Sequence, residues 1–333
     1  MEKAKKPFYK KVGFYVVAVT VLFVLIVGIV YLSSYGIQQL IIQIVCDDKS
    51  PSTPDNYAQI LEQTNKVSDI KYDSKYADGY LDIISPKDNN KTLPLVMYIH
   101  GGYYVGGDKL TKEAYCRVIA DKGYIVANIN YVLSPQGQYP AQLLQANTAM
   151  AYLMANASTY NIDTSKVFIG GDSAGGHLSG QLGAYYTNKT FSDNFEGKTA
   201  IEAKQLKGVL LLCGFYNYFT VRATNFPLLN EAMWMFSGER EYEKAPMANL
   251  INTIDNISAS FPSTYMTCGD KDPFYSQNQE MATKLKSFGV TVVDFLPKTT
   301  SKDLKHEFQS DFSLPECKVG LEKLFVFMSE AIK

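Results

Sequence analysis

The chain has 333 residues, of which 46% are hydrophobic, and a formal net charge of −1. Its length is sufficient for one large α/β domain of roughly 250–300 residues with a sizeable core. Because acidic and basic residues nearly balance, no general attraction to nucleic acid is expected. The five cysteines are widely spaced and form no C-x-x-C pair, so neither a disulfide framework nor a metal cluster is predicted.

The N-terminus predicts a short basic tail followed by a membrane anchor. Residues 1–11 contain five lysines and one glutamate, and residues 12–32 contain no charged residue. As a helix, this apolar stretch would be about 31 Å long, which matches the hydrocarbon core of a bilayer. A cleaved signal peptide is the alternative, but no Ala-x-Ala-like site follows the stretch. The lysines predict a cytoplasmic N-terminus, with all later residues extracellular or lumenal.

Residues 33–79 predict a juxtamembrane helix and a linker. Apolar residues recur at helical spacing between Ile37 and Val45, with glutamines between them. Such a helix has two interpretations. It lies at the membrane interface or packs on the domain, which we favour, or it forms a cap over an active site. Residues 47–57 are typical of a loop. The polar stretch that follows predicts a short helix near residues 58–66.

From residue 80 onward, apolar runs alternate with helical patterns, and one α/β domain is expected over residues 80–333. The expected strands are 80–85, 93–99, 124–131, 167–169, 206–213, 263–268 and 290–296, and the expected helices are 111–122, 140–154, 174 onward, 277–288 and 318–332. This order predicts a parallel sheet with helices on both faces. The aromatic stretch 215–261 breaks the pattern and is either a lid or pocket wall, or an ordinary connecting helix.

A serine lies at the expected corner between a strand and a helix. The residues Gly170-Gly171-Asp172-Ser173-Ala174-Gly175-Gly176 follow an apolar run and precede a helical pattern. This is the G-x-S-x-G nucleophile elbow, in which small neighbours permit a strained turn. The pattern also arises in ordinary loops, so further residues are needed to support Ser173 as a nucleophile.

A serine nucleophile needs a base, and the chain has three histidines. His306 lies in a loop after the last expected strand, where an imidazole can be positioned freely. His100 ends an expected strand inside a glycine loop. His177 lies four residues after Ser173 on the same helix, which would carry its ring away from the serine, so a structural role is favoured. His306 is therefore the predicted base.

The base needs a carboxylate that orients it and stabilises its protonated form. Asp272, before Pro273, follows an expected strand and is the preferred candidate, with Asp270 as its rival. The resulting order of Ser173, Asp272 and His306 along the chain is that of the α/β-hydrolases.

Backbone N–H groups could stabilise the oxyanion of the tetrahedral intermediate. A rigid loop after an earlier strand holds Gly101, Gly102 and Tyr103, and Ala174 follows the serine directly. These four residues are the predicted oxyanion-hole donors.

Together, these motifs resemble the hormone-sensitive-lipase-like branch of the α/β-hydrolase superfamily, which contains carboxylesterases and arylacetamide deacetylases. The resemblance rests on residues 100–102, 139–142 and 170–176, and on Asp272 and His306. It implies an α/β-hydrolase fold, hydrolysis of short acyl esters, and no metal or organic cofactor. Some relatives are anchored by one N-terminal helix.

The chain departs from the family in its oxyanion loop. The family's His-Gly-Gly-Gly is His-Gly-Gly-Tyr here, with Tyr103 in the last position. Tyr103 can donate its N–H only if the backbone there does not require a positive φ. Two donor pairs therefore stay open: Gly101 with Gly102, or Gly102 with Tyr103.

The expected function is that of a membrane-anchored serine carboxylesterase that forms an acyl-enzyme on small-molecule esters. An amidase or deacetylase acting on lumenal or cell-surface substrates is the alternative, because both reactions pass through an acyl-enzyme. A catalytically silent scaffold with a hydrolase fold is disfavoured, since all three triad residues are present.

Overall fold

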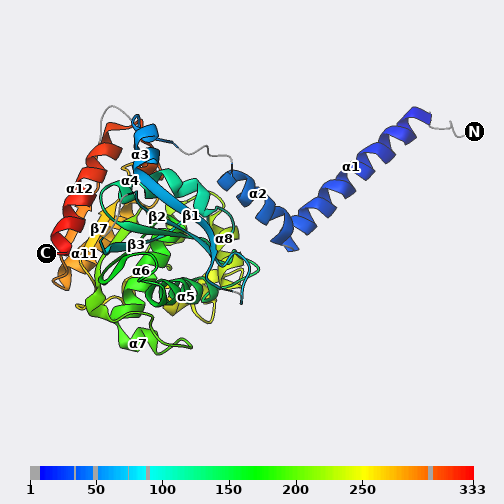
Figure 1. The fold of residues 1–333 in the computed structure, drawn as a ribbon. Helices are drawn as coiled ribbons and strands as arrows, with labels where there is room; N and C mark the ends of the chain where they lie inside the picture. The colour runs from blue at the N-terminus through cyan, green and yellow to red at the C-terminus, as the bar shows by residue number, and fades with distance from the viewer. Residues whose placement is uncertain (1–7, 34, 48–51, 74, 88–90, 299–302) are drawn as a thin grey trace, which may run out of the picture.

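The computed structural model describes residues 8–33, 35–47, 52–73, 75–87, 91–298 and 303–333. Its centre is an eight-stranded sheet with the strand order β1-β2-β4-β3-β5-β6-β7-β8 (Figure 1). The strands are β1 (Thr64–Lys71), β2 (Tyr80–Pro86), β3 (Leu93–Ile99), β4 (Ile125–Ile129), β5 (Ile162–Asp172), β6 (Leu206–Leu212), β7 (Thr264–Thr267) and β8 (Val292–Phe295). β2 is antiparallel to both of its neighbours, and the pairs from β4 to β8 are parallel.

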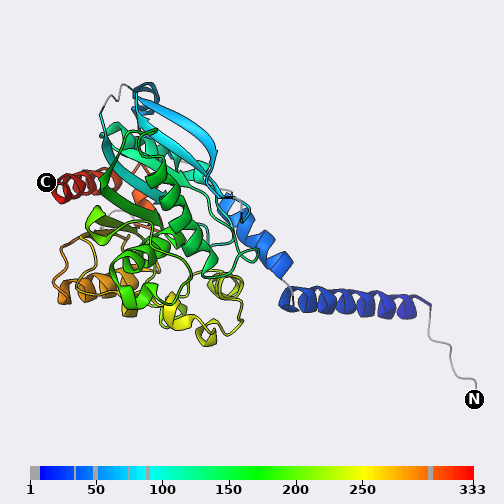
Figure 2. The ribbon, with the colours of Figure 1, turned by 60° about the horizontal axis from the view of Figure 1, so that its bottom comes forward.

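Helices cover both faces of the sheet (Figure 2). The helices are α1 (Phe8–Ser33), α2 (Tyr35–Asp47), α3 (Tyr57–Gln63), α4 (Glu113–Asp121), α5 (Ala141–Ala155), α6 (Ala174–Thr187), α7 (Lys189–Ser192), α8 (Leu229–Ser237), α9 (Ala248–Ile251), α10 (Thr253–Asn256), α11 (Tyr275–Ser287) and α12 (Pro315–Ala331), with 3-10 turns η1 (Lys109–Lys112), η2 (Ala203–Gln205), η3 (Val221–Thr224), η4 (Tyr242–Lys244) and η5 (Phe308–Ser310). α4 and α12 share one core cluster, and α5, α6 and α11 share the other.

The central strand β3 shows why its sequence is a continuous apolar run. Val96 and Tyr98 belong to the cluster of α4 and α12, whereas Leu95, Met97 and Ile99 belong to the cluster of α5 and α6. Successive side chains of a strand point to opposite faces, so a strand covered by helices on both sides is apolar throughout. The predicted α/β-hydrolase fold, with its mostly parallel sheet, is confirmed.

Strand β1 was not predicted from the sequence. The helix expected near residues 58–66 is α3, and it ends at Gln63. The chain then runs directly into β1, which pairs with β2. β1 is a mostly polar edge strand whose side chains are largely exposed, so the apolar pattern of a buried strand is missing from it. The sheet therefore begins at Thr64, inside the segment 33–79 that the sequence analysis assigned to a helix and a linker or cap.

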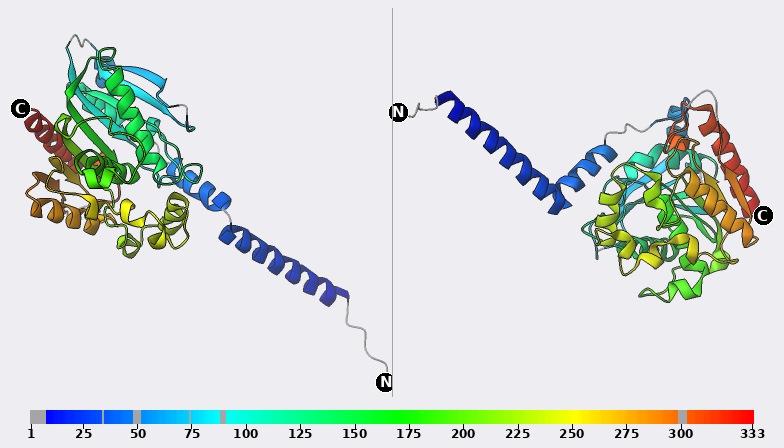
Figure 3. Two further views of the ribbon diagram at one scale, coloured as in Figure 1. Left: turned by 90° about the horizontal axis from the view of Figure 1, so that it is seen from below. Right: turned by 180° about the vertical axis from the view of Figure 1, so that it is seen from behind.

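The two N-terminal helices differ in how they contact the domain. α1 projects away from it in every view (Figures 1 and 3), and residues Val12–Val30 are a candidate membrane span by length and composition, with none of this window buried. α2 packs on the domain near α8, with Gln38 and Ile42 buried. A signal sequence near the N-terminus would share the length and composition of α1.

Candidate active site

Ser173 occupies the sharp corner between β5 and α6, near the middle of the sheet. Its φ of +52° is in the left-handed region, which non-glycine residues rarely adopt. Glycines permit this turn to lie against the neighbouring strand β3. A Cβ at Gly171 or Gly175 would lie 2.3 or 2.0 Å from the carbonyl oxygen of Ile99. The corner therefore has the form that the nucleophile-elbow motif predicts.

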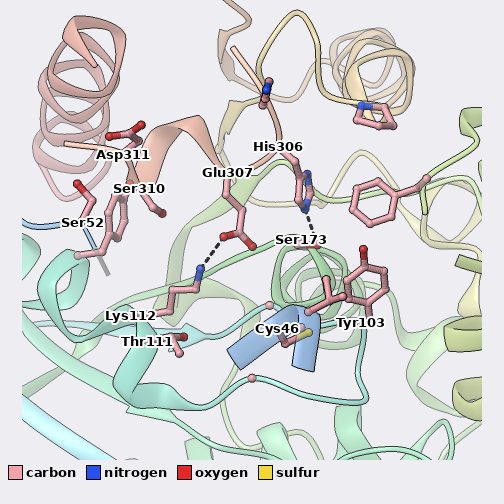
Figure 4. A pocket seen from close by; sticks show the side chains of 18 of the residues that line it. Cys46, Ser52, Tyr103, Thr111, Lys112, Ser173, His306, Glu307, Ser310 and Asp311 are labelled. Carbon is pink, nitrogen blue, oxygen red and sulfur yellow. Dashed lines mark hydrogen bonds and ion pairs between the residues drawn. The ribbon is translucent and has the colours of Figure 1, made fainter. Parts of the chain in front are cut away.

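The structure brings the three predicted triad residues together. Figure 4 shows two of them, Ser173 and His306, facing each other. His306 Nε2 lies 2.9 Å from Ser173 Oγ, and His306 Nδ1 lies 2.8 Å from Asp272 Oδ2. The Asp272 side chain is fully buried, and its Oδ1 accepts a hydrogen bond from the Phe274 N–H. In such a chain of contacts, a proton can move from the serine hydroxyl to the imidazole, and the buried carboxylate stabilises the imidazolium that forms.

Of the two rival carboxylates, Asp272 contacts the imidazole. Asp270 Oδ1 instead accepts a hydrogen bond of 3.3 Å from the N–H of Leu304. The loop after β7 holds the histidine loop through its backbone as well, because Lys271 donates its N–H to the carbonyl of Leu304 at 3.0 Å. Asp270 thus helps to place the loop that carries His306.

The other two histidines are buried and have structural contacts. His177 Nδ1 lies 2.8 Å from the Tyr104 hydroxyl, and His177 Nε2 lies 2.9 Å from the carbonyl oxygen of Ile251. His100 Nδ1 lies 2.6 Å from the carbonyl oxygen of Gly101. Burial lowers the pKa of each imidazole to about 4. The structural role that the sequence analysis favoured for His177 agrees with these contacts.

The glycine loop after β3 lies directly against the nucleophile. A Cβ at Gly101 would be 3.1 Å from the Cβ of Ser173. The N–H of Gly101 donates to Asp172 Oδ2 at 3.2 Å, so it is already engaged. Within the described residues, the N–H groups of Gly102, Tyr103 and Ala174 take part in no hydrogen bond. Of the two donor pairs that the sequence left open, the geometry favours Gly102 with Tyr103.

This loop requires left-handed backbone at a residue that is not glycine. Tyr103 has a φ of +61°, so it does not meet the condition that the sequence analysis set for it as a donor. A positive φ strains the backbone of a residue with a Cβ but does not remove its N–H, so Tyr103 stays a candidate donor, held in strained backbone. Gly102 has a φ of +120°, and a Cβ there would lie 2.2 Å from the carbonyl oxygen of Gly106. Only glycine fits at position 102 without moving the loop.

A buried ion-pair network joins the elbow to the histidine loop. Lys112 Nζ lies 2.9 Å from Asp172 Oδ2 and 3.0 Å from Glu307 Oε2. Burial alone would lower the pKa of Lys112, but the two carboxylates outweigh it and hold the pKa above its ordinary value. Tyr98 donates its hydroxyl hydrogen to Asp172 Oδ1. The network fixes the residue before Ser173 relative to the residue after His306.

This ion-pair network was not predicted from the sequence. Lysine is seldom buried, and no local spacing links Lys112 to a carboxylate almost two hundred residues later. The position of Asp172 beside the serine was the only local signal.

Ser173 and His306 line a cavity of about 740 Å³. One wall comes from α2, through Val45 and Cys46, and another from the insertion 215–261, through Phe226. The Phe226 ring lies 4.8 Å from the His306 ring and 5.3 Å from the Tyr103 ring, measured between centroids. The stretch 215–261, whose role the sequence left open, therefore contributes to the wall of this pocket, and so does α2, for which a cap over the site was the less favoured interpretation.

One cluster has the residue types of a metal site. The ligand atoms of Cys213, Asp272 and His306 lie within 4.8 Å of one another. Both ring nitrogens of His306, however, are engaged with Asp272 and Ser173. Burial raises the pKa of the Cys213 thiol well above its usual value, which disfavours the thiolate that binds metals. These contacts fit a proton relay better than a metal centre.

Comparison with known proteins supports an esterase relationship. The sequence pattern of the BD-FAE family matches residues 81–286. An α/β hydrolase of Acanthamoeba polyphaga mimivirus is 28% identical over 214 residues, covering 62% of this chain and 60% of that protein. Versiconal hemiacetal acetate esterase of Dothistroma septosporum is 26% identical over 245 residues, covering 72% of this chain and 73% of that protein.

A solved structure carries the same fold. Esterase B of Lactobacillus rhamnosis superimposes with a TM-score of 0.72 and 21% identity, covering 85% of this chain and 88% of that chain. The chain spans only about three fifths of the length of the viral relative. The family pattern itself extends from β2 to the end of α11. The chain therefore belongs to the BD-FAE family, within the carboxylesterase branch of the α/β-hydrolases.

Proposed function

We propose that this protein is a membrane-anchored serine hydrolase that cleaves small-molecule carboxylic esters through an acyl-enzyme. The observation that carries the proposal is the chain of contacts from Ser173 through His306 to Asp272. It is supported by the esterase relatives and by the pocket that opens over the serine.

The proposed reaction assigns a role to each of these atoms. Ser173 Oγ attacks the ester carbonyl carbon while His306 Nε2 accepts the hydroxyl proton. The tetrahedral intermediate collapses, the bond to the alcohol oxygen breaks, and His306 returns the proton to the departing alcohol. Water then repeats the sequence on the acyl-enzyme and releases the acid. Asp272 keeps the proton-bearing Nδ1 of His306 oriented and stabilises the imidazolium form throughout.

The oxyanion would be held by backbone N–H groups that are already in place. Gly102 and Tyr103 line the pocket beside Ser173, and Ala174 begins α6 directly after it. Because the loop is fixed before the substrate binds, these donors stabilise developing charge without reorganisation. Each such donor is typically worth about 3–4 kcal/mol of transition-state stabilisation.

Hydrolysis of p-nitrophenyl acetate by the full chain in detergent tests the reaction. Ser173→Ala should reduce the rate to the background, while Ser260→Ala, at an exposed position, should leave it unchanged. p-Nitroacetanilide, assayed in parallel, tests the amidase alternative, which predicts release of 4-nitroaniline well above the background rate, whereas an enzyme restricted to esters should leave the anilide intact. Hydrolysis of neither substrate would favour the silent scaffold, and activity retained by Ser173→Ala would contradict the proposed nucleophile.

We further propose that α1 spans the membrane once, with the N-terminus in the cytoplasm and the catalytic domain extracellular or lumenal. Support comes from the exposed apolar window Val12–Val30 and from the five lysines in residues 1–11. The intact chain should resist extraction by alkaline carbonate, and in sealed vesicles its domain should be protected from added protease. A mature protein that lacks α1, or a domain digested in sealed cytoplasm-out vesicles, would contradict this topology.

A further inference from the structure

Chain connectivity restricts where α2 can lie if α1 crosses a bilayer. α1 ends at Ser33 and α2 begins at Tyr35. Two peptide units span at most about 8 Å. The polar headgroup region on each side of a bilayer is of similar thickness, roughly 5–7 Å. The first turn of α2 therefore falls within or just above the headgroup layer.

α2 has one face on the domain and an apolar face directed away from it. Gln38 and Ile42 are buried against the domain, and Gln43 donates its side-chain N–H to the Val105 carbonyl at 3.2 Å. Leu40 and Ile44, one helical turn apart, are each 57% exposed. No charged residue occurs in α2 before Asp47, its last residue. An uncharged helix with a domain-facing side and an outward apolar side suits a position between the protein and lipid.

Aromatic and basic side chains flank the start of this helix. The Tyr35 ring lies 4.6 Å from the ring of Trp234 on α8, and the Arg240 guanidinium lies 3.9 Å from the same indole. Trp234 and Tyr35 are half-buried and Arg240 is exposed. Tryptophan and tyrosine are enriched at the level of lipid headgroups, where an apolar ring meets polar surroundings. The group thus has the composition of an interfacial anchor.

The other end of α2 forms part of the active-site pocket. Val45 and Cys46 line the cavity that contains Ser173. Figure 4 shows Cys46 and Ser173 in this cavity. The contact with the glycine loop is close, because a Cβ at Gly106 would lie 3.2 Å from the Cβ of Cys46. One short helix therefore connects the end of α1 to the mouth of the pocket.

We propose that the outward face of α2, together with Tyr35 and Trp234, rests on the bilayer surface, so that the pocket receives esters that partition into the membrane. The proposal depends on the anchoring by α1 proposed above and deepens the proposed function by naming the substrate class: amphiphilic esters with a lipophilic alcohol or acyl part. A second copy of the chain could cover the same face, and the experiments below distinguish the two.

Tryptophan fluorescence of the unmodified chain reports on this contact, because Trp234 is the only tryptophan in the sequence. The full chain would be reconstituted in phosphatidylcholine vesicles, with and without lipids that carry a bromine or a nitroxide near the glycerol backbone. Trp234 fluorescence should fall in the presence of these lipids, whereas acrylamide in the water should quench it only weakly. Quenching by acrylamide alone would overturn the proposal, and so would protection from both quenchers, which is expected of a dimer contact.

A matched variant moves the reporter to the opposite side of the domain. Trp234→Phe combined with Val326→Trp places the only tryptophan on α12, at a position that is 62% exposed. α12 lies on the far side of the sheet from α2 in both orientations (Figures 1 and 3). In this variant, lipid quenching should be lost and acrylamide quenching gained. Equal lipid quenching of both tryptophans would mean nonspecific adsorption and would overturn the proposal.

Two alkyl acetates test the substrate class without changing the acyl-enzyme. Ethyl acetate stays largely in water and tetradecyl acetate partitions into the vesicle, while both form the same acetyl-enzyme. Leu40→Glu combined with Ile44→Glu should lower kcat/KM for tetradecyl acetate several-fold and leave ethyl acetate unchanged. An equal loss on both acetates would overturn the proposed entry from the membrane. A wild-type chain that hydrolyses neither acetate would refute the proposed function, while Trp234 quenching would still decide the surface contact.

Discussion

The two sides of the active-site pocket are held together by different forces. On the sheet side, the elbow and the glycine loop lie in backbone-to-backbone contact, and Lys112 joins them to the histidine loop through buried ion pairs. On the helical side, α2 and the insertion 215–261 contribute mainly apolar and aromatic contacts, such as that of Phe226 with His306. His177 bridges the sides, since it contacts both Tyr104 and Ile251.

The sheet side of the pocket suits the chemical step, and the helical side suits the selection of substrates. Close backbone packing and buried ion pairs fix atoms to within fractions of an ångström, which catalysis by proton transfer and oxyanion binding requires. Apolar side-chain contacts tolerate repacking, so the helical side can select substrates without disturbing the chemistry. Changes on the sheet side should therefore impair every substrate, and changes on the outer face of α2 should impair only esters that reach the pocket through the membrane.

The largest effect is expected from the carboxylate that contacts the imidazole. Asp272→Asn should lower kcat on p-nitrophenyl acetate by about 10⁴-fold, because the amide favours the wrong imidazole tautomer. Asp270→Asn is the matched control and should stay within a few-fold of the parent rate, since Asp270 contacts the backbone of Leu304. Steady-state kinetics on the two variants decides between the carboxylates, and equal losses would contradict the distinction.

Removing the buried ammonium group of Lys112 should mainly lower the free energy of unfolding. Lys112→Met takes the ammonium from between Asp172 and Glu307, and breaking a buried ion pair typically costs about 3–5 kcal/mol. Urea unfolding followed by circular dichroism measures the loss. Lys122→Met, at an exposed pair with Asp121, should change stability by less than about 1 kcal/mol. Similar midpoints for the two variants would show that the buried network contributes little.

The oxyanion loop is expected to show a catalytic loss with little change in substrate binding. Gly102→Ala adds a methyl group 2.2 Å from the Gly106 carbonyl oxygen, so the loop must shift and its N–H groups must move. A loss of about 10²–10³-fold in kcat is expected, as for removal of one oxyanion donor. Gly123→Ala, which meets no neighbouring atom at its Cβ, controls for backbone strain because it also has a positive φ. Full activity of Gly102→Ala would contradict the assignment of this loop.

Stability should fall in mild acid because of the bridging histidine. Burial lowers the pKa of His177 from 6.5 to about 4. Above pH 6.5 the imidazole is neutral in both states; as the pH falls toward 4, the unfolded chain binds a proton that the folded chain does not, so stability decreases. The total loss from this group is about 3 kcal/mol. His177→Gln should flatten the dependence of the urea midpoint on pH between about 7 and 5, although His100 still contributes. An unchanged slope would contradict the low pKa.

Local patterns predicted the parts of the site that lie close in the sequence. The elbow around Ser173 needs glycines that a sequence displays directly, and the scarcity of histidine singled out His306. The parallel sheet followed from apolar runs such as β3. These features depend on residue type and spacing within one or two elements.

The remaining features depend on contacts between distant segments. Lys112 and Glu307 meet only after the sheet forms, and a lysine in a sequence is most often exposed. The donor pair of the oxyanion loop was left open because the φ of Tyr103 and the engagement of the Gly101 N–H by Asp172 both depend on how the chain folds. β1 was not predicted because an exposed edge strand lacks the apolar run of a buried strand. No neighbouring residue pattern indicated that Cys46 would lie in the pocket wall.

Active-site labelling tests the central claim most directly. A fluorophosphonate probe should phosphonylate the full chain at one site, which peptide mass spectrometry should locate at Ser173, and His306→Ala should slow the labelling by orders of magnitude. Ser173→Ala should neither label nor hydrolyse p-nitrophenyl acetate. Labelling at another serine, or a Ser173→Ala protein that keeps its esterase activity, would contradict the account.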